Sequence, residues 1–284
     1  MHQTSPLSVS ATLSRGLPLI VAHRGEWAES PENSLAAFAD ARAAGAHIVE
    51  FDTQTVADGT LVVIHDETVD RTTDGSGAVA DLALAEIRAL RLRAGGGGDE
   101  APLTPLWVPT LAEALEAVRG RVLVNIDTKY MRDLDTVAAT VLAMDMADQV
   151  VLKGPVDLDG DNARFLNAPW FGQIPFMPIL PAREGRFAED AARIIADFRP
   201  SMLEIGFSRL EDVLEARPVL DHHNVRLWTN TLDPVHSLDF NDTRAKSDPD
   251  AVWGRLIDAG ITVLQTDLSP QLARYLTERY ESFF

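Results

Sequence analysis

The sequence predicts a (β/α)₈ barrel, the α/β fold in which eight parallel strands alternate with eight helices. Short runs of apolar and β-branched residues alternate with amphipathic helical patterns along the chain. Eight such runs are present, and the length of 284 residues is close to the ~250 usual for this fold. A doubly wound parallel sheet shows the same alternation and is the competing architecture.

The strands follow from these apolar runs, and one further run does not join the barrel. Ala57-Asp58-Gly59 is a turn signal, so we expect Leu61–Ile64 to form a hairpin with the second strand. Residues 53–109, roughly, then form a small insertion above the barrel mouth, within a single domain of residues 18–284. The expected barrel strands are Leu19–His23, His47–Asp52, Val122–Asp127, Gln149–Lys153, Ile174–Ile179, Met202–Gly206, Val225–Thr229 and Ile261–Thr266.

Several expected helices carry recognisable start or stop signals. Thr110–Glu113 and Ser208–Glu211 have the capping-box pattern, in which a hydroxyl and a Glu satisfy the first free backbone N–H groups. Asp248-Pro249 and Ser269-Pro270 place a capping side chain before a helical proline. Gly45 is expected to close the helix Leu35–Ala44.

Composition excludes several classes of protein. The chain has 25 basic residues, 43 acidic residues and no cysteine, for a net charge of −18. Disulfides and thiolate metal sites are therefore absent. An acidic chain without a basic stripe argues against nucleic-acid binding. No apolar run approaches the ~18 residues of a transmembrane segment. The oligomeric state is not determined by the sequence.

Residues 1–17 are rich in Ser and Thr, and we expect them to form an N-terminal tail. They lack the basic start and the continuous apolar stretch of a secretory signal. We therefore expect a soluble protein, with the cytoplasm favoured, although a mature exported form in the periplasm is also compatible with the sequence.

Polar side chains interrupt the strand faces that should point into the barrel. With a period of two, His23 shares a face with apolar residues of the first strand, and His65 continues the face of the hairpin strand. Glu50 and Asp52 share a face of the second strand, and Asp127 lies on the same face of the third. All of these residues fall near the carboxyl ends of strands, where barrel enzymes build their active sites.

These residue types point to metal-assisted phosphate chemistry. Glu50, Asp52 and Asp127 supply three oxygen ligands, which favour Mg²⁺, Ca²⁺ or Mn²⁺ over zinc or copper. A divalent cation also offsets the repulsion between three neighbouring carboxylates. His23 and His65 flank this site and titrate near neutrality, as a general acid and a general base do.

The two nearby cations complete the pattern. Arg24 can hold a phosphate bidentately, and Lys129 shares the face of Asp127. A single Glu-x-Asp is usually a solvated pair, and a lone His at a strand end is usually structural. The recurrence of such residues at equivalent positions of consecutive strands favours a site for phosphate-ester hydrolysis.

An ordered set of motifs in the first part of the chain resembles the glycerophosphodiester phosphodiesterase family. The match extends over about 60 residues, and weaker similarities continue to residue 267. The stronger motifs are His23-Arg24-Gly25, Pro31-Glu32-Asn33-Ser34, Gly45-Ala46, Glu50-Phe51-Asp52, Asp58-Gly59, Val62-Val63-Ile64-His65-Asp66 and Asp70-Arg71-Thr72-Thr73 with Gly75 and Gly77. The weaker ones are Val108–Leu111, Asn125–Lys129, Leu227–Asn230 and Gln265–Asp267.

The resemblance implies a (β/α)₈ barrel with a small insertion after the second strand. It implies that His23 and His65 are the catalytic pair and that Glu50, Asp52 and Asp127 bind one Mg²⁺ or Ca²⁺. Members of the family hydrolyse glycerophosphodiesters to glycerol 3-phosphate and an alcohol. The commoner family pattern has Glu at the third ligand, so Asp127 reaches one methylene less and binds the metal either directly or through water.

Other roles are hypotheses about single residues. We expect His23 to act as the base and His65 as the acid, and Lys129 to contact the phosphate. Trp228 is expected in the wall of the alcohol pocket, with core filling as the alternative. Lys153, at the end of the fourth barrel strand, is the other lysine that could contact the phosphate. Glu204 could bind a polyol hydroxyl or pair with Lys153.

Three alternatives stay open. A related phosphodiesterase could act on lysophospholipids or phosphoinositides, with Leu103, Leu106 and Trp107 as an apolar lip for the lipid. A non-catalytic phosphodiester-binding barrel would keep the fold without turnover. A metal-dependent sugar isomerase would need more His and Glu ligands on the later strands.

Overall fold

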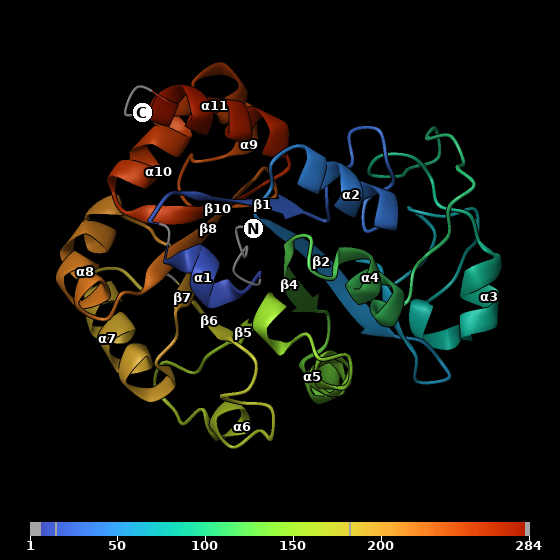
Figure 1. Ribbon diagram of the computed structural model, residues 1–284, viewed down its shortest axis with the longest axis horizontal. Helices are drawn as coiled ribbons and strands as arrows, with labels where there is room; N and C mark the ends of the chain where they lie inside the picture. The colour runs from blue at the N-terminus through green and yellow to red at the C-terminus, as the bar shows by residue number, and fades with distance from the viewer. Residues whose placement is uncertain (1–6, 15, 182, 282–284) are drawn as a thin grey trace, which may run out of the picture.

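Eight parallel strands close into a barrel in the computed structural model, which describes residues 7–14, 16–181 and 183–281 (Figure 1). Neighbouring strands follow the order β1, β10, β8, β7, β6, β5, β4, β2, and pairing of β1 with β2 closes the ring. The predicted barrel is confirmed. Its strands are β1 (Leu19–His23), β2 (Ile48–Thr55), β4 (Leu123–Thr128), β5 (Val150–Pro155), β6 (Phe176–Leu180), β7 (Met202–Ile205), β8 (Arg226–Leu232) and β10 (Ile261–Thr266).

Two barrel strands run three residues beyond their predicted ends because each continues into a hairpin. β2 extends to Thr55 because it pairs antiparallel with β3 (Leu61–Val63), as the Ala57-Asp58-Gly59 turn predicted. β8 extends to Leu232 because it pairs antiparallel with β9 (Val235–His236). The second hairpin was not predicted.

Helices surround the strands (Figure 1). The Thr110–Glu113 capping box is confirmed, but the Ser208–Glu211 box is wrong, because that helix begins at Leu210 without a side-chain cap. The α-helices are α1 (Val9–Leu13), α2 (Leu35–Ala43), α3 (Leu84–Ala89), α4 (Leu111–Val118), α5 (Leu134–Ala143), α6 (Ala163–Leu166), α7 (Phe187–Phe198), α8 (Leu210–His222), α9 (Asp242–Ser247), α10 (Arg255–Asp258) and α11 (Ser269–Glu281). Short 3₁₀ segments are η1 (Val79–Asp81), η2 (Met131–Asp133) and η3 (Ala147–Gln149), and η4 (Asp250–Gly254) is a π-helical turn.

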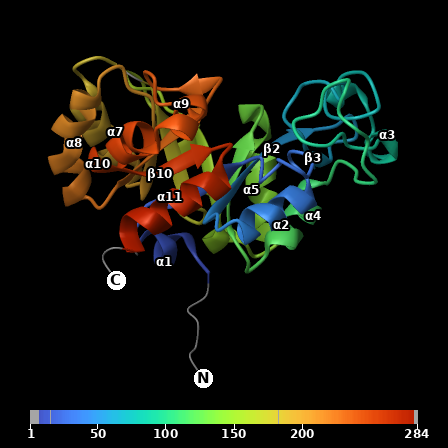
Figure 2. The same ribbon diagram turned by 90° about the horizontal axis from the view of Figure 1, so that it is seen from above.

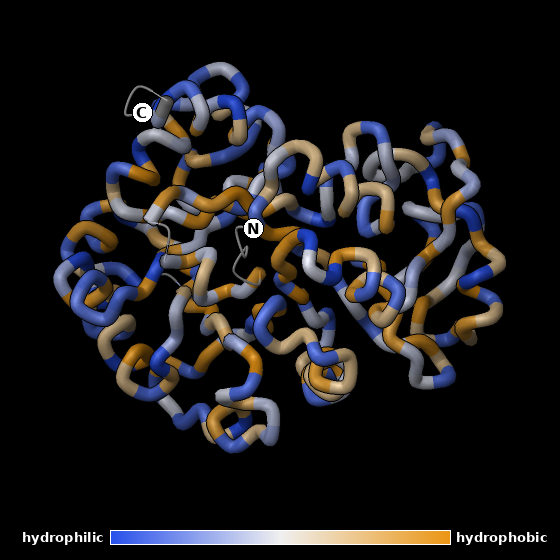
Figure 3. Tube along the Cα trace, in the orientation of Figure 1, coloured by the Kyte–Doolittle hydropathy of each residue, from blue (hydrophilic) through white to orange (hydrophobic). Residues whose placement is uncertain are grey.

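The hydrophobic core has two layers, as expected for this fold. The larger layer packs the outer faces of the strands against the helices. The smaller layer fills the barrel, and the strands run as hydrophobic segments through the centre of Figure 3. Its buried members are Val9, Leu19, Val21, Ile48, Leu123, Val151, Met177, Met202, Trp228 and Val263.

The segment expected to be a tail contains α1, which lies across the amino-terminal end of the strands (Figure 1). Val9 of this helix is buried in the inner core layer. The guanidinium group of Arg226 donates hydrogen bonds to the carbonyl oxygens of Leu13 and Leu17. The inner end of the predicted tail is therefore packed against the barrel floor; residues 1–6 and 15 lie outside the described residues.

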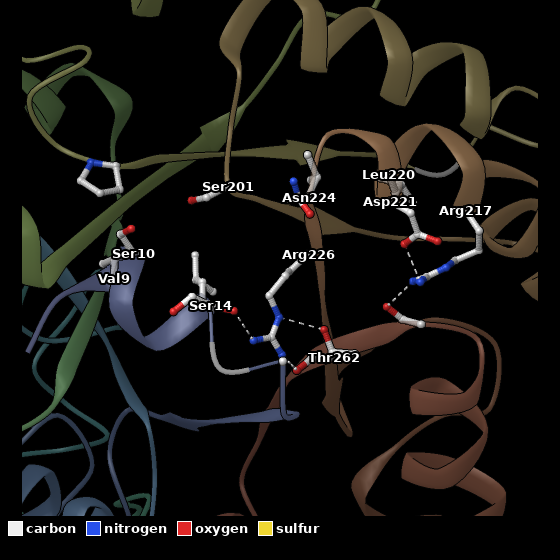
Figure 4. A pocket seen from close by; sticks show the side chains of 15 residues that line it. Val9, Ser10, Ser14, Ser201, Arg217, Leu220, Asp221, Asn224, Arg226 and Thr262 are labelled. Carbon is white, nitrogen blue, oxygen red and sulfur yellow. Dashed lines mark hydrogen bonds and ion pairs between the residues drawn. The ribbon is translucent and has the colours of Figure 1, made fainter.

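A cavity of about 750 Å³ lies at this same end of the barrel (Figure 4). Ser10 of α1 and Ser14, the residue after that helix, line it, together with Arg226 and Thr262 from the strands. The side chain of Arg226 is held there by Thr262, and Arg217 is paired with Asp221. Chemistry in this fold takes place at the opposite, carboxyl-terminal end of the strands.

The insertion between β2 and α4 has a small core of its own. It projects to one side of the barrel and includes α3 (Figure 2). Its buried residues are Val56, Val62, Ile64, Val69, Val79, Ile87, Leu92 and Val108. The insertion predicted after the second strand is thus present, and it carries His65 beside the barrel mouth.

Among the described residues, no helix is both long enough and apolar enough to cross a lipid bilayer.

Candidate active site

Three carboxylates meet at the carboxyl-terminal end of the barrel. Glu50 and Asp52 come from β2 and Asp127 comes from β4, where it lies directly opposite Asp52 in the strand register. One oxygen atom from each lies within 4.8 Å of the others. The period of two, which puts these side chains on the inward face, therefore brings together all three predicted ligands.

Burial acts against the charged forms of Glu50 and Asp52. The pKa of Glu50 is raised, first by burial and then by the neighbouring charge of Asp52. Burial also acts to raise the pKa of Asp52, but the charges of Arg24, His65 and His23 outweigh it, so that the pKa is lowered. A set of close carboxylates with a destabilised charge is suited to a divalent cation.

The Pro-Glu-Asn-Ser motif holds the cluster in place from the loop before α2. Asn33 donates from Nδ2 to Asp52 Oδ2 at 2.9 Å and accepts from the Asp52 backbone N–H at 3.2 Å. Ser34 caps α2 by accepting from the backbone N–H of Ala37. One short motif therefore starts a helix and also orients a candidate metal ligand.

Arg24 lies directly beside the carboxylates. Its Nε is 3.2 Å from Asp52 Oδ2, its Nη1 donates to Glu32 Oε1 at 3.1 Å, and its backbone N–H donates to Glu50 Oε2. The next residue must be glycine: Gly25 has a φ of +84°, and a Cβ there would lie 2.8 Å from the backbone of Ala37. The tight turn after β1 thus brings the guanidinium group to the cluster.

His23 is paired with the carboxylate of Asp267, for which the sequence motifs predict no role. Its Nδ1 lies 2.7 Å from Asp267 Oδ1, just after β10. Burial acts to lower the pKa of His23, but the hydrogen bond to Asp267 and the charge of Glu50 outweigh it, so that the pKa is raised. Asp267 continues the inward face of Val263 and Gln265, so the period-of-two rule could have found it.

His65 has the same arrangement on the insertion. Its Nδ1 lies 2.7 Å from Asp66 Oδ1, and Asp66 Oδ2 accepts from Arg71 Nε at 2.7 Å. Arg71 also donates from Nη2 to Glu32 Oε1 at 2.7 Å, and Glu32 binds Arg24 as well. These hydrogen bonds, above all those from Arg71, hold the pKa of Asp66 far below its usual range.

The two lysines at the mouth differ in their contacts. Lys129 follows β4, and no hydrogen bond or ion pair of its ammonium group is found among the described residues. Lys153 is almost fully buried, with its Nζ 2.9 Å from Asp127 Oδ2 and 3.3 Å from Glu204 Oε2. The pairing of Glu204 with Lys153, one of the two roles considered for Glu204, is therefore present.

Trp228 does not line a pocket wall. Its side chain is fully buried in the inner core layer, and its Nε1 donates to Asn230 Oδ1 at 3.2 Å. Trp228 and Asn230 share the inward face of β8, and Trp228 lies one layer deeper. The expected contact with the alcohol is corrected to the alternative, core filling.

Two family models match different parts of the chain. The sequence model of the glycerophosphoryl diester phosphodiesterase family matches residues 23–159, and a model of a domain of unknown function matches residues 176–276. A glycerophosphodiester phosphodiesterase of Caldanaerobacter subterraneus subsp. tengcongensis is 47% identical over 112 residues, which are 39% of this chain and 45% of the relative. Glycerophosphodiester phosphodiesterase 1 of Mus musculus is 41% identical over 125 residues, 42% of this chain and 36% of the relative. The chain thus spans less than half the length of these curated relatives.

Solved structures match over nearly the whole chain. A glycerophosphodiester phosphodiesterase from Agrobacterium tumefaciens has a TM-score of 0.67 and 26% identity, covering 91% of this chain and 100% of that one. A glycerophosphoryl diester phosphodiesterase from Parabacteroides distasonis has a TM-score of 0.75 and 22% identity, covering 99% and 94%, and supports the fold. Residues 23–159 thus carry the sequence pattern of the glycerophosphoryl diester phosphodiesterase family, and the barrel as a whole has the fold of these solved structures.

Proposed function

We propose that the protein hydrolyses glycerophosphodiesters to glycerol 3-phosphate and an alcohol. The observation that carries this proposal is the arrangement of two histidines, each bound through Nδ1 to its own carboxylate, next to a cluster of three carboxylates. Both imidazoles lie near enough to Asp52 to lower its pKa by their charge. A phosphodiesterase from Oleispira antarctica, which shares the fold with a TM-score of 0.66, was solved in complex with the product sn-glycerol-3-phosphate.

Glu50, Asp52 and Asp127 fit a single divalent cation, which we propose is Mg²⁺ or Ca²⁺. The donor set consists only of carboxylate oxygens, which hard cations prefer. The raised pKa of Glu50 supports the fit, because burial and then the neighbouring charge of Asp52 disfavour its ionised form, which a cation would stabilise. When bound, such a cation supplies positive charge that stabilises the phosphate oxygens in the transition state.

The protein's own groups bind the anion and move the protons. Arg24, and Lys129 at the end of β4, bind the phosphodiester. Because Nδ1 of each histidine faces a carboxylate, Nε2 is the atom that exchanges a proton with the substrate. His23 accepts the proton of the attacking hydroxyl, which is water or the glycerol 2-hydroxyl, and His65 donates a proton to the leaving alkoxide oxygen. Attack by the 2-hydroxyl gives a cyclic phosphate, which water then opens.

The test of the reaction is a panel of glycerophosphodiesters, assayed for release of glycerol 3-phosphate with Mg²⁺ or Ca²⁺ and with a chelator. Release in the presence of metal, and its loss on chelation, is the expected result. If no diester is hydrolysed after metal is restored, the protein is a binding barrel and the proposal is wrong.

Replacement of either histidine tests the proton transfers. We expect His23→Ala and His65→Ala each to lower kcat by about 10²–10⁴-fold, because each removes one proton-transfer group. Mg²⁺ affinity, measured by calorimetry, should be unchanged. A diester with a p-nitrophenolate leaving group needs no protonation, so it should restore much of the rate of His65→Ala and little of that of His23→Ala. Near-wild-type turnover in either variant would contradict the pair.

A further inference from the structure

A smaller cavity, of about 200 Å³, opens at the same end of the barrel as the carboxylate cluster. It lies between the carboxyl-terminal ends of β6, β7 and β8 and the β8–β9 hairpin. Its polar lining includes Glu204, Asn230 and His236, and its apolar lining includes Pro181 and Val235. All of these residues fall within 176–276, the part of the chain that matches a domain of unknown function.

A single ammonium group connects this cavity with the candidate metal ligands. Lys153 Nζ lies between Asp127 Oδ2 and Glu204 Oε2, at 2.9 and 3.3 Å. Glu204 therefore faces the cavity while its charge is balanced by a residue that also contacts the cluster. Lys153 thus places Glu204, and the cavity that it lines, beside the cluster.

Glu204 has acceptor capacity that the protein does not use. The residue is 7% exposed, and Oε1 accepts from Asn230 Nδ2 at 3.0 Å. Oε2 accepts no hydrogen bond from the described residues, and its contact is the ion pair with Lys153. Oε2 is inaccessible to solvent, so a ligand in the cavity would meet Oε1, which accepts one hydrogen bond from the described residues and has a second lone pair.

The rest of the lining agrees with a ligand that donates hydrogen bonds. His236 Nδ1 lies 3.1 Å from the carbonyl oxygen of Leu232, so Nδ1 carries the proton and Nε2 is an acceptor. A volume of 200 Å³ holds roughly seven water-sized groups, which suits a small alcohol and is too small for a fatty acyl chain. The cavity is open to solvent, and Val235 in its lining is 53% exposed.

We propose that this cavity binds the alcohol arm of the diester and selects small alcohols that carry hydroxyl or ammonium donors, with Glu204 as the specificity-determining acceptor. This inference rests on the proposed hydrolysis. The alcohol leaves first when the glycerol 2-hydroxyl attacks, so its site must be open to solvent, as this cavity is.

The first experiment compares two headgroups of similar size. Glycerophosphoethanolamine has N–H donors, whereas glycerophosphocholine has a quaternary nitrogen without them. We expect kcat/KM to favour the ethanolamine diester by about tenfold, the effect of one hydrogen bond to a charged acceptor. Glu204→Gln should reduce that preference severalfold. Equal use of both diesters by the wild type would overturn the inference.

The second experiment fills the cavity. Val235→Trp should raise KM for glycerophosphoethanolamine about tenfold and leave KM for the methyl ester of glycerol 3-phosphate unchanged, because a methyl group does not enter the cavity. Leu214→Trp, at a site of similar exposure on α8, is the matched control and should change neither KM. An equal rise in KM for both substrates with Val235→Trp would mean that the glycerol arm occupies the cavity, which contradicts the inference.

The two proposals fail in different ways. If the protein hydrolyses diesters but does not discriminate between alcohols, only the cavity assignment is wrong. If it hydrolyses none, the proposed reaction is wrong, and calorimetry with the same two diesters still measures the preference. Equal affinity of wild type and Glu204→Gln for both diesters in that experiment would also reject the cavity assignment.

Discussion

Each of the two histidines of the site is bound through Nδ1 to an aspartate, and the two pairs lie at different places in the fold. His23 is bound by Asp267 from β10, and His65 by its neighbour Asp66 on the insertion. A carboxylate on Nδ1 fixes the tautomer and the ring orientation, and it stabilises the imidazolium that forms when the histidine takes up a proton. Each carboxylate is itself held in place: the backbone N–H of Asp267 donates to Asp242, and Asp66 accepts from Arg71.

Asp267→Asn tests the support of His23. We expect kcat/KM to fall about tenfold to hundredfold, because the ring loses its fixed orientation while the catalytic group remains. The acid limb of the pH profile should move to lower pH, since loss of the carboxylate charge lowers the pKa of His23. If Asp267 had only a structural role, the acid limb of the pH profile would not move. In the double variant with His23→Ala, the loss should be no larger than that of His23→Ala alone.

For Lys153 and Asp267, the residue-level prediction missed the contacts with Asp127 and with His23. Both lie on inward strand faces at carboxyl ends, as the predicted ligands do. The sequence could not say which of several such residues touch, because contact between β10 and β1, or between β5 and β7, depends on closure of the barrel. Asp127, by contrast, was predictable as a neighbour of Asp52 because β2 and β4 pair directly.

At the scale of elements, the insertion is tied to the barrel through Arg71. Its guanidinium group bridges Asp66 on the insertion and Glu32 on the loop before α2. The glycine-rich segment fits closely here: Gly97 has a φ of +74°, and a Cβ there would lie 2.3 Å from the carbonyl oxygen of Arg71. The four-glycine loop thus lets the backbone approach the arginine that positions the Asp66–His65 pair.

Arg71→Lys tests this connection. Lysine keeps the charge but lacks the planar fork that binds two carboxylates at once. We expect kcat to fall about tenfold because Asp66 and His65 lose their fixed position. Arg91→Lys, an exposed position of the same insertion, is the control and should retain full activity. If both variants behave alike in steady-state assays, Arg71 has no positioning role.

Asp242 connects α9 with β8 and β10 through side-chain hydrogen bonds. It begins α9 and accepts hydrogen bonds from Thr231 of β8, from Thr266 of β10 and from the backbone N–H of Asp267. Burial outweighs these hydrogen bonds and raises the pKa of Asp242 to about 6. The folded protein therefore holds a proton on this carboxyl at a pH where the unfolded chain has released it.

This raised pKa makes the folded protein less stable as the pH rises. A carboxyl whose pKa is higher in the folded state loses stabilisation as the pH rises through the interval from 3.8 to about 6. We expect the free energy of unfolding of the wild type, relative to Asp242→Asn, to fall by about 3 kcal/mol between pH 4 and pH 7. Urea unfolding at several pH values measures this difference. A difference that is constant over this range would contradict the raised pKa.

At the scale of the molecule, the net charge of −18 and the carboxylate cluster predict that stability depends on cations. A ligand that binds only the folded state stabilises it by about 2.7 kcal/mol at a hundredfold excess over Kd. For a chain of this size, that corresponds to a rise in Tm of about 5 °C. We expect this rise with Mg²⁺ or Ca²⁺ and its loss with a chelator, measured by calorimetry.

Two variants separate site binding from general screening of the negative charge. Glu50→Gln removes one candidate ligand and should abolish most of the rise in Tm. Asp99→Asn removes one exposed charge on the insertion and should leave the rise intact. If the rise survives in Glu50→Gln, the cation acts on the whole charged surface and the cluster is not its site.

The sequence by itself determined the barrel, the insertion after the second strand and the polar residues at the carboxyl ends of β1, β2 and β4. These features are local or periodic: strand runs, a hairpin turn, and side chains that alternate faces every second residue. The tertiary structure alone decided that Trp228 fills the core, that α1 closes the barrel floor, and that Lys153 joins Asp127 to Glu204. Such contacts join residues far apart in the chain, and only closure of the sheet into a ring fixes which inward side chains meet and how deeply each is buried.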